Sequence, residues 1–183
     1  MPTLALTLGL LALCALHAHA EVSVQPDFQD DKILGKWYSI GLASNSKWFQ
    51  SKKHVLTMCS TVIAPAADGS LVVTSTYPKS NDCEQKSMTF FKTEQPGRFR
   101  ATSARWSSEH DIIITETNYV EYALVLNRKT KGTEVSTMVT LYGREKNLRP
   151  ELVQKFQQFS LEQGLPQSSI LILPHTDRCI NEA

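Results

Sequence analysis

Between residues 36 and 143, apolar and polar residues alternate in short runs that are rich in β-branched and aromatic side chains. Turn signals such as Ala67-Asp68-Gly69 and Gln95-Pro96-Gly97 separate the runs, which is typical of strands joined by tight turns. Because links of this length join neighbouring antiparallel strands, we expect an all-β fold, an eight-stranded up-and-down barrel without exposed sheet edges. The pattern places its strands near residues 36–42, 54–65, 70–77, 84–93, 97–105, 110–117, 120–128 and 134–143.

The period of the pattern changes after residue 149. Apolar residues then recur at helical spacing, at Leu152, Val153, Phe156 and Phe159. Pro150 suits a first helical turn, and Gly164 suits the position after a helix end. We therefore expect one C-terminal amphipathic helix that packs on the barrel wall. A last apolar run at 170–173 is expected to add an edge strand.

The first twenty residues carry an apolar run followed by Ala18-His19-Ala20, which is the pattern of a secretory signal peptide cleaved after Ala20. The apolar run is too short to span a bilayer, so no transmembrane segment is expected. Residues 21–183 have a length that suits a single domain. We therefore expect a protein that passes through the endoplasmic reticulum and is secreted.

Charge and short motifs exclude several classes of function. Nineteen Lys and Arg residues stand against eighteen Asp and Glu, so neither a nucleic-acid surface nor an acidic tail is expected. The sequence has no Gly-x-Ser-x-Gly elbow, dinucleotide glycine pattern, phosphate loop or His-Glu-x-x-His motif. His54, His110 and His175 are isolated from one another in the sequence, which argues against a metal site. We expect no bound cofactor and no metal.

Three cysteines remain once Cys14 leaves with the leader, and they allow three single bridges. Cys83 follows a turn-forming segment and Cys179 lies in a polar tail, whereas Cys59 lies in a predicted strand, so local context favours a Cys83–Cys179 disulfide. Closing that loop would stabilise the fold by roughly 4 to 5 kcal/mol. Cys59 would then be a free thiol, and the pattern alone also allows an inert buried thiol or an intermolecular disulfide.

An eight-stranded barrel can fill its own interior or hold one small ligand. Hydroxyl residues on the predicted strands favour a ligand-holding interior, because a solid core would carry aliphatic side chains there. Many of these hydroxyls are expected on the outer face, where Thr is a common strand residue. The hydroxyl residues are Thr57, Ser60, Thr61, Thr74, Ser75, Thr76, Thr115, Thr117, Ser136, Thr137 and Thr140. The strand period of two puts Cys59 on one face with Thr57, Thr61 and Ile63, and Met58, Ser60 and Val62 on the other. The pattern leaves open which face points inward.

Three segments, Gly35-Lys36-Trp37-Tyr38, 115–119 and Leu141-Tyr142-Gly143-Arg144, resemble in order the three signature segments of the lipocalin family. The middle segment departs from the family pattern, because it carries Asn118 where an aspartate is usual. The resemblance implies that Trp37 closes one end of the barrel and that Arg144 lies across its ring, which is a cation–π contact.

Segments at 22–26, 41–46, 58–59, 64–65 and 173–179 further resemble the prostaglandin D synthase branch of that family. The resemblance implies an isomerase that converts prostaglandin H2 to prostaglandin D2 with no bound redox cofactor and with a free thiol reductant in solution. It places Cys59 inside the barrel as the nucleophile, with active-site hydroxyls at Ser39, Thr61 and Ser75. The implied disulfide, Cys83 to Cys179, agrees with the context argument.

Burial raises the pKa of a thiol, so we expect Ser39 and Thr61 to assist its ionisation and Ser75 to donate a hydrogen bond to a substrate oxygen. Ligand contacts are expected at Trp37, Met58, Val73 and Tyr77, with Trp48 and Trp106 at the pocket entrance. The segment Lys52-Lys53-His54 is a candidate for attracting the substrate carboxylate.

The main alternative is a non-enzymatic carrier of retinoids, bile pigments or similar lipophiles, since one apolar cavity suits both functions. A scavenger whose thiol traps electrophiles or oxidants is a weaker alternative. A monomer is expected in each case.

Overall fold

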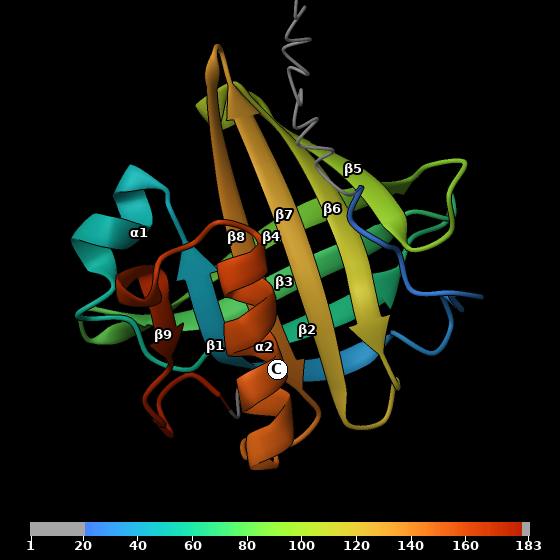
Figure 1. Cartoon of the computed structure of the whole chain (residues 1–183). Coiled ribbons are helices and arrows are strands. Elements are labelled where there is room, and N and C mark those ends of the chain that lie inside the picture. The colour runs from blue at the N-terminus through green and yellow to red at the C-terminus, as the bar shows by residue number, and fades with distance from the viewer. Residues whose placement is uncertain (1–20, 181–183) are drawn as a thin grey trace, which may run out of the picture.

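The protein folds into a closed antiparallel β-barrel with a helix packed on its outer wall (Figure 1). A computed structural model describes residues 21–180, so the expected leader at 1–20 lies outside the described residues. In the described part the strand order is β2-β3-β4-β5-β6-β7-β8-β1-β9, and β1 also pairs with β2, which closes the barrel. The elements are β1 (Gly35–Ser44), α1 (Lys47–Lys52), β2 (Ser60–Pro65), β3 (Leu71–Lys79), β4 (Asp82–Lys92), β5 (Arg98–Ser103), a 3₁₀ turn (Ala104–Trp106), β6 (Ser108–Thr117), β7 (Tyr122–Lys131), β8 (Glu134–Gly143), α2 (Pro150–Glu162), a 3₁₀ turn (Gln167–Ser169) and β9 (Ile170–Ile172).

The predicted eight-stranded barrel is confirmed, but β2 starts at Ser60 and not near residue 54. The backbone before it pairs elsewhere, because the Met58 amide donates to the carbonyl oxygen of Pro174 over 2.9 Å. Helix α1 was not predicted. The Ser46 side chain caps it by accepting a hydrogen bond from the Phe49 amide, and Phe49 is its buried residue. A six-residue helix with one buried side chain has no periodicity to detect.

The hairpin between β7 and β8 is longer than predicted. Strand β7 continues to Lys131, and the turn occurs at Gly132, whose φ of +60° suits glycine. Residues 129–131, which the predicted strand bounds left outside both strands, instead pair with β8. The hairpin therefore extends the barrel wall beyond its neighbours (Figure 1).

A buried tryptophan closes one end of the barrel. The Trp37 indole nitrogen donates to the Ile33 carbonyl oxygen over 2.8 Å, and the Arg144 guanidinium carbon lies 3.7 Å from the centre of the Trp37 ring. Arg144 also donates to the carbonyl oxygens of Tyr119, Lys36 and Lys32. The expected cation–π contact is confirmed, and the three hydrogen bonds hold the guanidinium in place.

The predicted helix is also confirmed, since α2 begins at Pro150 and the chain leaves it through Gly164, whose φ is +80°. Its apolar stripe packs on the outer wall of the barrel, where Phe156 is fully buried. A Cβ atom at Gly41 of β1 would lie 2.6 Å from the Phe156 ring, so glycine permits this close approach. Strand β9 then pairs with β1, as the last apolar run predicted.

Cys83 of β4 and Cys179 form a disulfide, as local context favoured. Cys59 is a free thiol. Among residues 21–180, no helix has the length and apolar character needed to cross a membrane.

Candidate active site

Cys59 lies immediately before β2, and not within a strand as predicted. Its carbonyl oxygen nevertheless accepts a hydrogen bond from the Ser39 amide over 3.0 Å, so the alternation of faces continues through it. Thr61 and Ile63 line the barrel cavity, and the thiol lies on that inward side. Ser60 faces the opposite side, where its hydroxyl donates to the Cys179 carbonyl oxygen. The structure thereby answers the question that the sequence left open: the face with Cys59, Thr61 and Ile63 points inward.

The four side chains predicted to be catalytic meet as two hydrogen-bonded pairs. Ser39 Oγ lies 3.0 Å from Cys59 Sγ and also accepts a hydrogen bond from the Cys59 amide over 2.9 Å. Thr61 Oγ1 lies 2.9 Å from Ser75 Oγ, because Thr61 and Ser75 are direct partners across β2 and β3. Each hydroxyl carries a single proton, so each can donate to only one of its neighbours at a time.

Burial raises the pKa of the Cys59 thiol above its usual 9.0, because an apolar surrounding disfavours the thiolate. Hydrogen bonds from Ser39 and Thr61 act in the opposite direction, since they stabilise the negative charge on sulfur. The net effect of the surroundings is a thiol that is mostly protonated at neutral pH. These two hydroxyls are therefore the groups that limit the rise of the thiol pKa.

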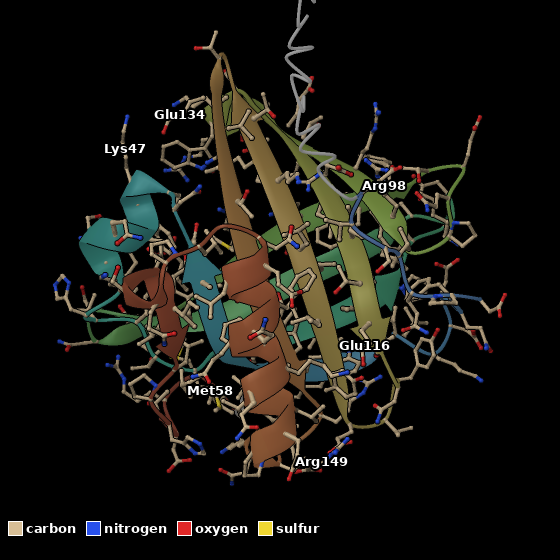
Figure 2. All side chains as sticks on the ribbon, in the orientation of Figure 1. Lys47, Met58, Arg98, Glu116, Glu134 and Arg149 are labelled. Carbon is tan, nitrogen blue, oxygen red and sulfur yellow. A yellow bond between two sulfur atoms is a disulfide. The ribbon has the colours of Figure 1, made fainter. Side chains whose placement is uncertain are left out.

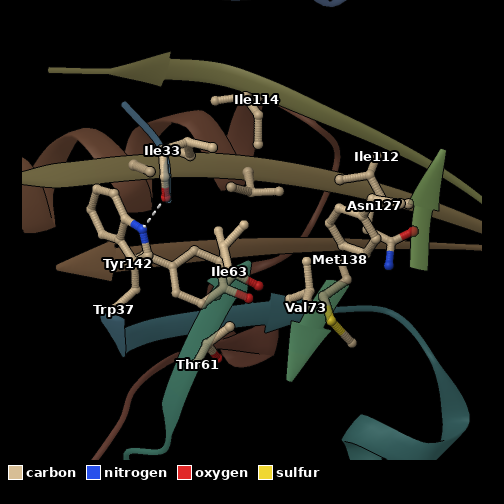
Figure 3. A pocket seen from close by; sticks show the side chains of 14 residues that line it. Ile33, Trp37, Thr61, Ile63, Val73, Ile112, Ile114, Asn127, Met138 and Tyr142 are labelled. Atoms are coloured by element: carbon tan, nitrogen blue, oxygen red, sulfur yellow. Dashed lines mark hydrogen bonds between the residues drawn. The ribbon is translucent and has the colours of Figure 1, made fainter. Parts of the chain in front are cut away.

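A narrow, mainly apolar cavity runs inside the barrel (Figure 3). Thr61 lines it, whereas Cys59, Ser39 and Ser75 are not among the lining residues. Its volume is about 100 Å³. Ligand pockets commonly measure roughly 300 to 1,000 Å³, so a lipid-sized ligand would have to displace lining side chains. The lining residues are Ile33, Trp37, Thr61, Ile63, Val73, Phe90, Ile112, Ile114, Ala123, Val125, Asn127, Met138, Thr140 and Tyr142.

Tyr142 is a functional candidate that the sequence did not single out, although it lies in one of the signature segments. It is the partner of Ser39 across β1 and β8 and lines the cavity. Burial raises the pKa of the Tyr142 phenol, and the nearby Cys59 sulfur raises it further, whereas hydrogen bonds with Thr140 and Thr61 lower it. Its phenol is therefore protonated at neutral pH and able to donate a hydrogen bond inside the cavity.

Basic side chains follow the apolar ones toward the open end of the barrel. His110 continues the inward face of Ile112 on β6, and its partner across the strands is Lys129 of β7. Lys86 of β4 is the partner of Ser75. Burial lowers the pKa of His110, and Lys129 and Lys86 lower it further. Continuing the two-residue alternation of each strand past its apolar positions would have placed His110, Lys129 and Lys86 on the inward face from the sequence alone.

The predicted ligand contacts divide into two groups. Trp37 and Val73 line the cavity, whereas Tyr77 lies further toward the mouth on the same face of β3, outside the lining. Met58 is fully buried, but it packs in the apolar layer that includes Phe156 of α2, and not on the cavity wall (Figure 2). Met58 is on the side opposite to Cys59, so the structure gives no support to its predicted ligand contact.

Trp48 and Trp106 are exposed and do not line the cavity. They lie on the loops around the open end because the short α1 and the 3₁₀ turn after β5 carry them. In the predicted basic segment, Lys53 Nζ donates to the Ser168 carbonyl oxygen over 2.6 Å, while Lys52 and His54 are exposed. These side chains lie around the entrance of the barrel and do not line the cavity.

Comparison with known proteins agrees with this geometry. The model of the lipocalin and cytosolic fatty-acid binding protein family matches residues 34–177, which is most of the chain. The chain belongs to the lipocalin family. The family match covers every strand of the barrel and α2.

Relatives of this lipocalin include both named enzymes and a protein named only by its family. It is 60% identical over 182 residues to a lipocalin of Rhinella marina, with a coverage of 100% for both chains. It is 47% identical to the prostaglandin-H2 D-isomerase of Mus musculus, with 96% of this chain and 93% of the relative covered. The enzyme of the same name from Canis lupus familiaris is 44% identical, with 96% and 92% covered.

A solved structure also shares the fold. The siderocalin Ex-FABP, which is described as functioning through dual ligand specificities, superimposes with a TM-score of 0.71 at 25% sequence identity. The match covers 81% of this chain and 98% of that protein. Lipocalin barrels bind small lipophilic molecules, and the disulfide of this lipocalin fits an oxidising, extracellular environment.

Proposed function

We propose that this lipocalin is a secreted isomerase that converts prostaglandin H2 to prostaglandin D2 through the Cys59 thiolate. The observation that carries the proposal is the free thiol on the inward side of the barrel, within hydrogen-bond distance of Ser39 and close to Thr61, which lines the cavity and pairs with Ser75. The named isomerases among the relatives, at 42–47% identity, support the same reaction. A free thiol has a direct use here, since a weak O–O bond reacts with a soft sulfur nucleophile.

In the proposed reaction, the thiolate attacks the endoperoxide oxygen on C11, so an S–O bond forms while the O–O bond breaks. The oxygen on C9 leaves as an alkoxide and takes a proton, which makes the C9 hydroxyl. Loss of the C11 proton then makes the C11 ketone, and the electron pair of the S–O bond returns to sulfur as thiolate. Substrate and product are isomers, so no bound redox cofactor is needed, and a thiol reductant in solution keeps Cys59 reduced.

The surrounding groups have separate roles in this proposal. Ser39 and Thr61 stabilise the thiolate, and Ser75 can orient Thr61 by donating to it. Tyr142 is a neutral donor inside the cavity and is suited to hydrogen-bond an oxygen of the endoperoxide. The inward-facing Lys86 and Lys129 supply positive charge for the substrate carboxylate near the mouth.

A pure carrier is the second candidate, because the cavity wall is mostly apolar and carries few polar groups. Retinoids and bile pigments are suitable ligands for such a wall. The two functions are compatible, since one cavity can hold a substrate or a non-reacting lipophile.

The test is incubation of the purified protein with prostaglandin H2 and a reducing thiol, followed by separation of the products. We expect prostaglandin D2 to form faster than by spontaneous decay, and we expect retinoic acid to inhibit by occupying the same cavity. A carrier would bind retinoic acid, measured by quenching of tryptophan fluorescence, and would not accelerate formation of any one isomer. That result would remove the isomerase proposal and leave the carrier.

The reaction should also depend on pH in the direction set by the thiol. Because the pKa of Cys59 is raised, the thiolate fraction and kcat/KM should increase about tenfold per pH unit from neutral pH toward 9. Ser39→Ala and Thr61→Val each remove a group that lowers this pKa, so each should decrease kcat/KM at pH 7 by about 3- to 30-fold.

Thr74→Val is the matched control for these two variants, since the Thr74 hydroxyl pairs with Ser87 on the outer face of the barrel. It should leave the pH profile of kcat/KM unchanged. A profile that is flat between pH 7 and 9 in the wild type would contradict the thiolate as the attacking species. Ionisation of Cys59 can be followed independently by the pH dependence of its alkylation rate.

A further inference from the structure

Exposed apolar side chains gather around the open end of the barrel. The connections β1–β2, β3–β4, β5–β6 and β7–β8 all lie at this end, because consecutive strands are antiparallel. We call the segments 45–58, 79–82, 103–108 and 131–135 the mouth rim. In the described residues, it holds four of the eight large apolar side chains that remain exposed, namely Trp48 (55% exposed), Val55 (62%), Trp106 (47%) and Val135 (59%).

The mouth rim is also basic. It contains six Lys or Arg residues and two acidic ones, whereas the segments at the opposite end, 21–34, 66–70, 93–97, 118–121 and 144–149, contain four basic and eight acidic residues. The formal charges of these segments therefore differ in sign between the two ends although the net charge is only +1; within the rim, Lys47 is paired with Glu134, and Lys79 with Glu84 of β4. Such an asymmetry orients the molecule in an electric field and turns the mouth toward a negative surface.

Exposed tryptophan and positive charge occur together within single segments of the mouth rim. The Arg105 guanidinium carbon lies 5.2 Å from the centre of the Trp106 ring, and Lys47 and Lys52 belong to the same short helix as Trp48. Lys47 forms an exposed ion pair with Glu134 of the β7–β8 hairpin, which links two parts of the rim (Figure 2). Tryptophan and lysine on one face are the combination that residues at a membrane–water interface show.

We propose that the mouth rim docks this lipocalin on the surface of an anionic phospholipid membrane. Trp48 and Trp106 enter the headgroup region, and Lys52, Arg105 and Lys131 lie beside lipid phosphates. The rim surrounds the opening of the cavity, so docking directs the mouth toward the bilayer. A lipophilic ligand can then pass between bilayer and cavity without crossing water.

A membrane explains these residues better than a protein partner. The exposed apolar side chains lie on three separate connections around an opening and alternate along the chain with Lys and Arg. A protein interface instead collects its apolar residues in one central patch, with charge at the rim and lysine depleted. Scattered apolar residues are ordinary on a monomer, but both exposed tryptophans lie at this end.

The test measures binding of the purified protein to phosphatidylcholine vesicles with and without about 30 mol% phosphatidylserine, by sedimentation. We expect binding to the anionic vesicles only, with the affinity falling about tenfold or more between roughly 0.05 and 0.5 M salt. The double variant Trp48→Ala/Trp106→Ala should weaken binding about tenfold or more. Lys52→Gln/Lys131→Gln should weaken it to a similar degree, at about fivefold per charge.

Matched controls lie away from the mouth. Phe91 on β4 has the same exposed fraction as Trp106, 47%, and Phe91→Ala should leave binding unchanged. Lys32→Gln/Lys92→Gln removes two charges near the closed end and should also have no effect. The midpoint of thermal unfolding checks that each variant is folded.

Several results would overturn the proposal. These are absence of binding to anionic vesicles, equal binding to neutral vesicles, or equal losses in the control and rim variants. The proposal does not depend on the isomerase reaction, because a carrier would need the same docking. Vesicle binding is measured without substrate, and conversion is measured without vesicles, so either can fail while the other holds.

Discussion

Replacing Cys59 by alanine should abolish conversion of prostaglandin H2 and leave ligand binding close to that of the wild type. The substitution removes the sulfur that forms the proposed covalent intermediate, and the hydroxyls around it are much weaker nucleophiles. We expect kcat/KM to fall by a factor of about 10³ or more, as for removal of a nucleophile from other enzymes. Conversion is measured by product separation, and binding by quenching of tryptophan fluorescence with retinoic acid.

Cys59→Ser is the matched control for shape. It keeps a polar side chain that can still pair with Ser39, so loss of activity in this variant cannot come from a cavity or from a displaced β2. Both variants should unfold within about 1 kcal/mol of the wild type, since one small group is changed. A Cys59→Ala protein that still forms prostaglandin D2 at a rate near that of the wild type would remove the thiol from the mechanism.

The second large effect is expected on stability. Replacing Cys83 and Cys179 by serine should lower the free energy of unfolding by about 4 to 5 kcal/mol, because the bridge spans 96 residues of sequence and restricts the unfolded chain. For a domain of this size, that loss corresponds to a decrease of roughly 10 to 20 °C in the melting temperature. Thermal unfolding without reductant, followed by circular dichroism, measures it.

The disulfide also positions the chain segment beside the candidate nucleophile. Ser60, next to Cys59, donates to the Cys179 carbonyl oxygen, and Lys36 Nζ donates to the Ile180 carbonyl oxygen over 2.6 Å. We therefore expect the double variant to lose part of its activity as well as its stability. Cys59→Ala keeps the bridge and is the control for the unfolding measurement. A double variant whose free energy of unfolding lies within about 1 kcal/mol of the wild-type value would contradict the prediction.

The barrel and α2 could be predicted from the sequence because their signals are local. Strand alternation and turn chemistry depend on neighbouring residues, and the apolar stripe of α2 between Pro150 and Gly164 does so too. The disulfide followed from the local context of each cysteine. Errors occurred where tertiary contacts override local preference. Residues 54–59 have strand-like composition, yet Met58 pairs with Pro174, far away in the sequence.

The composition of the candidate site was predicted in part. Cys59, Ser39, Thr61 and Ser75 do come together, but the sequence could not show that Ser39 contacts the thiol while Ser75 contacts Thr61. Their catalytic roles remain predictions. Tyr142 was missed because its relation to the thiol depends on the register between β1 and β8. The position of Met58 in the outer layer already followed from the period of two, which puts Met58 on the face opposite to Cys59.

The order and type of the strands, the position of α2 and the presence of an unpaired thiol were determined by the sequence alone, because periodicity and cysteine number are properties of the chain itself. The direction of that thiol, the rise in its pKa and the narrowness of the cavity were decided only by the tertiary structure. These properties depend on which side chains from distant strands surround one sulfur atom, and barrel closure through the pairing of β1 with β2 and β8 brings those strands together.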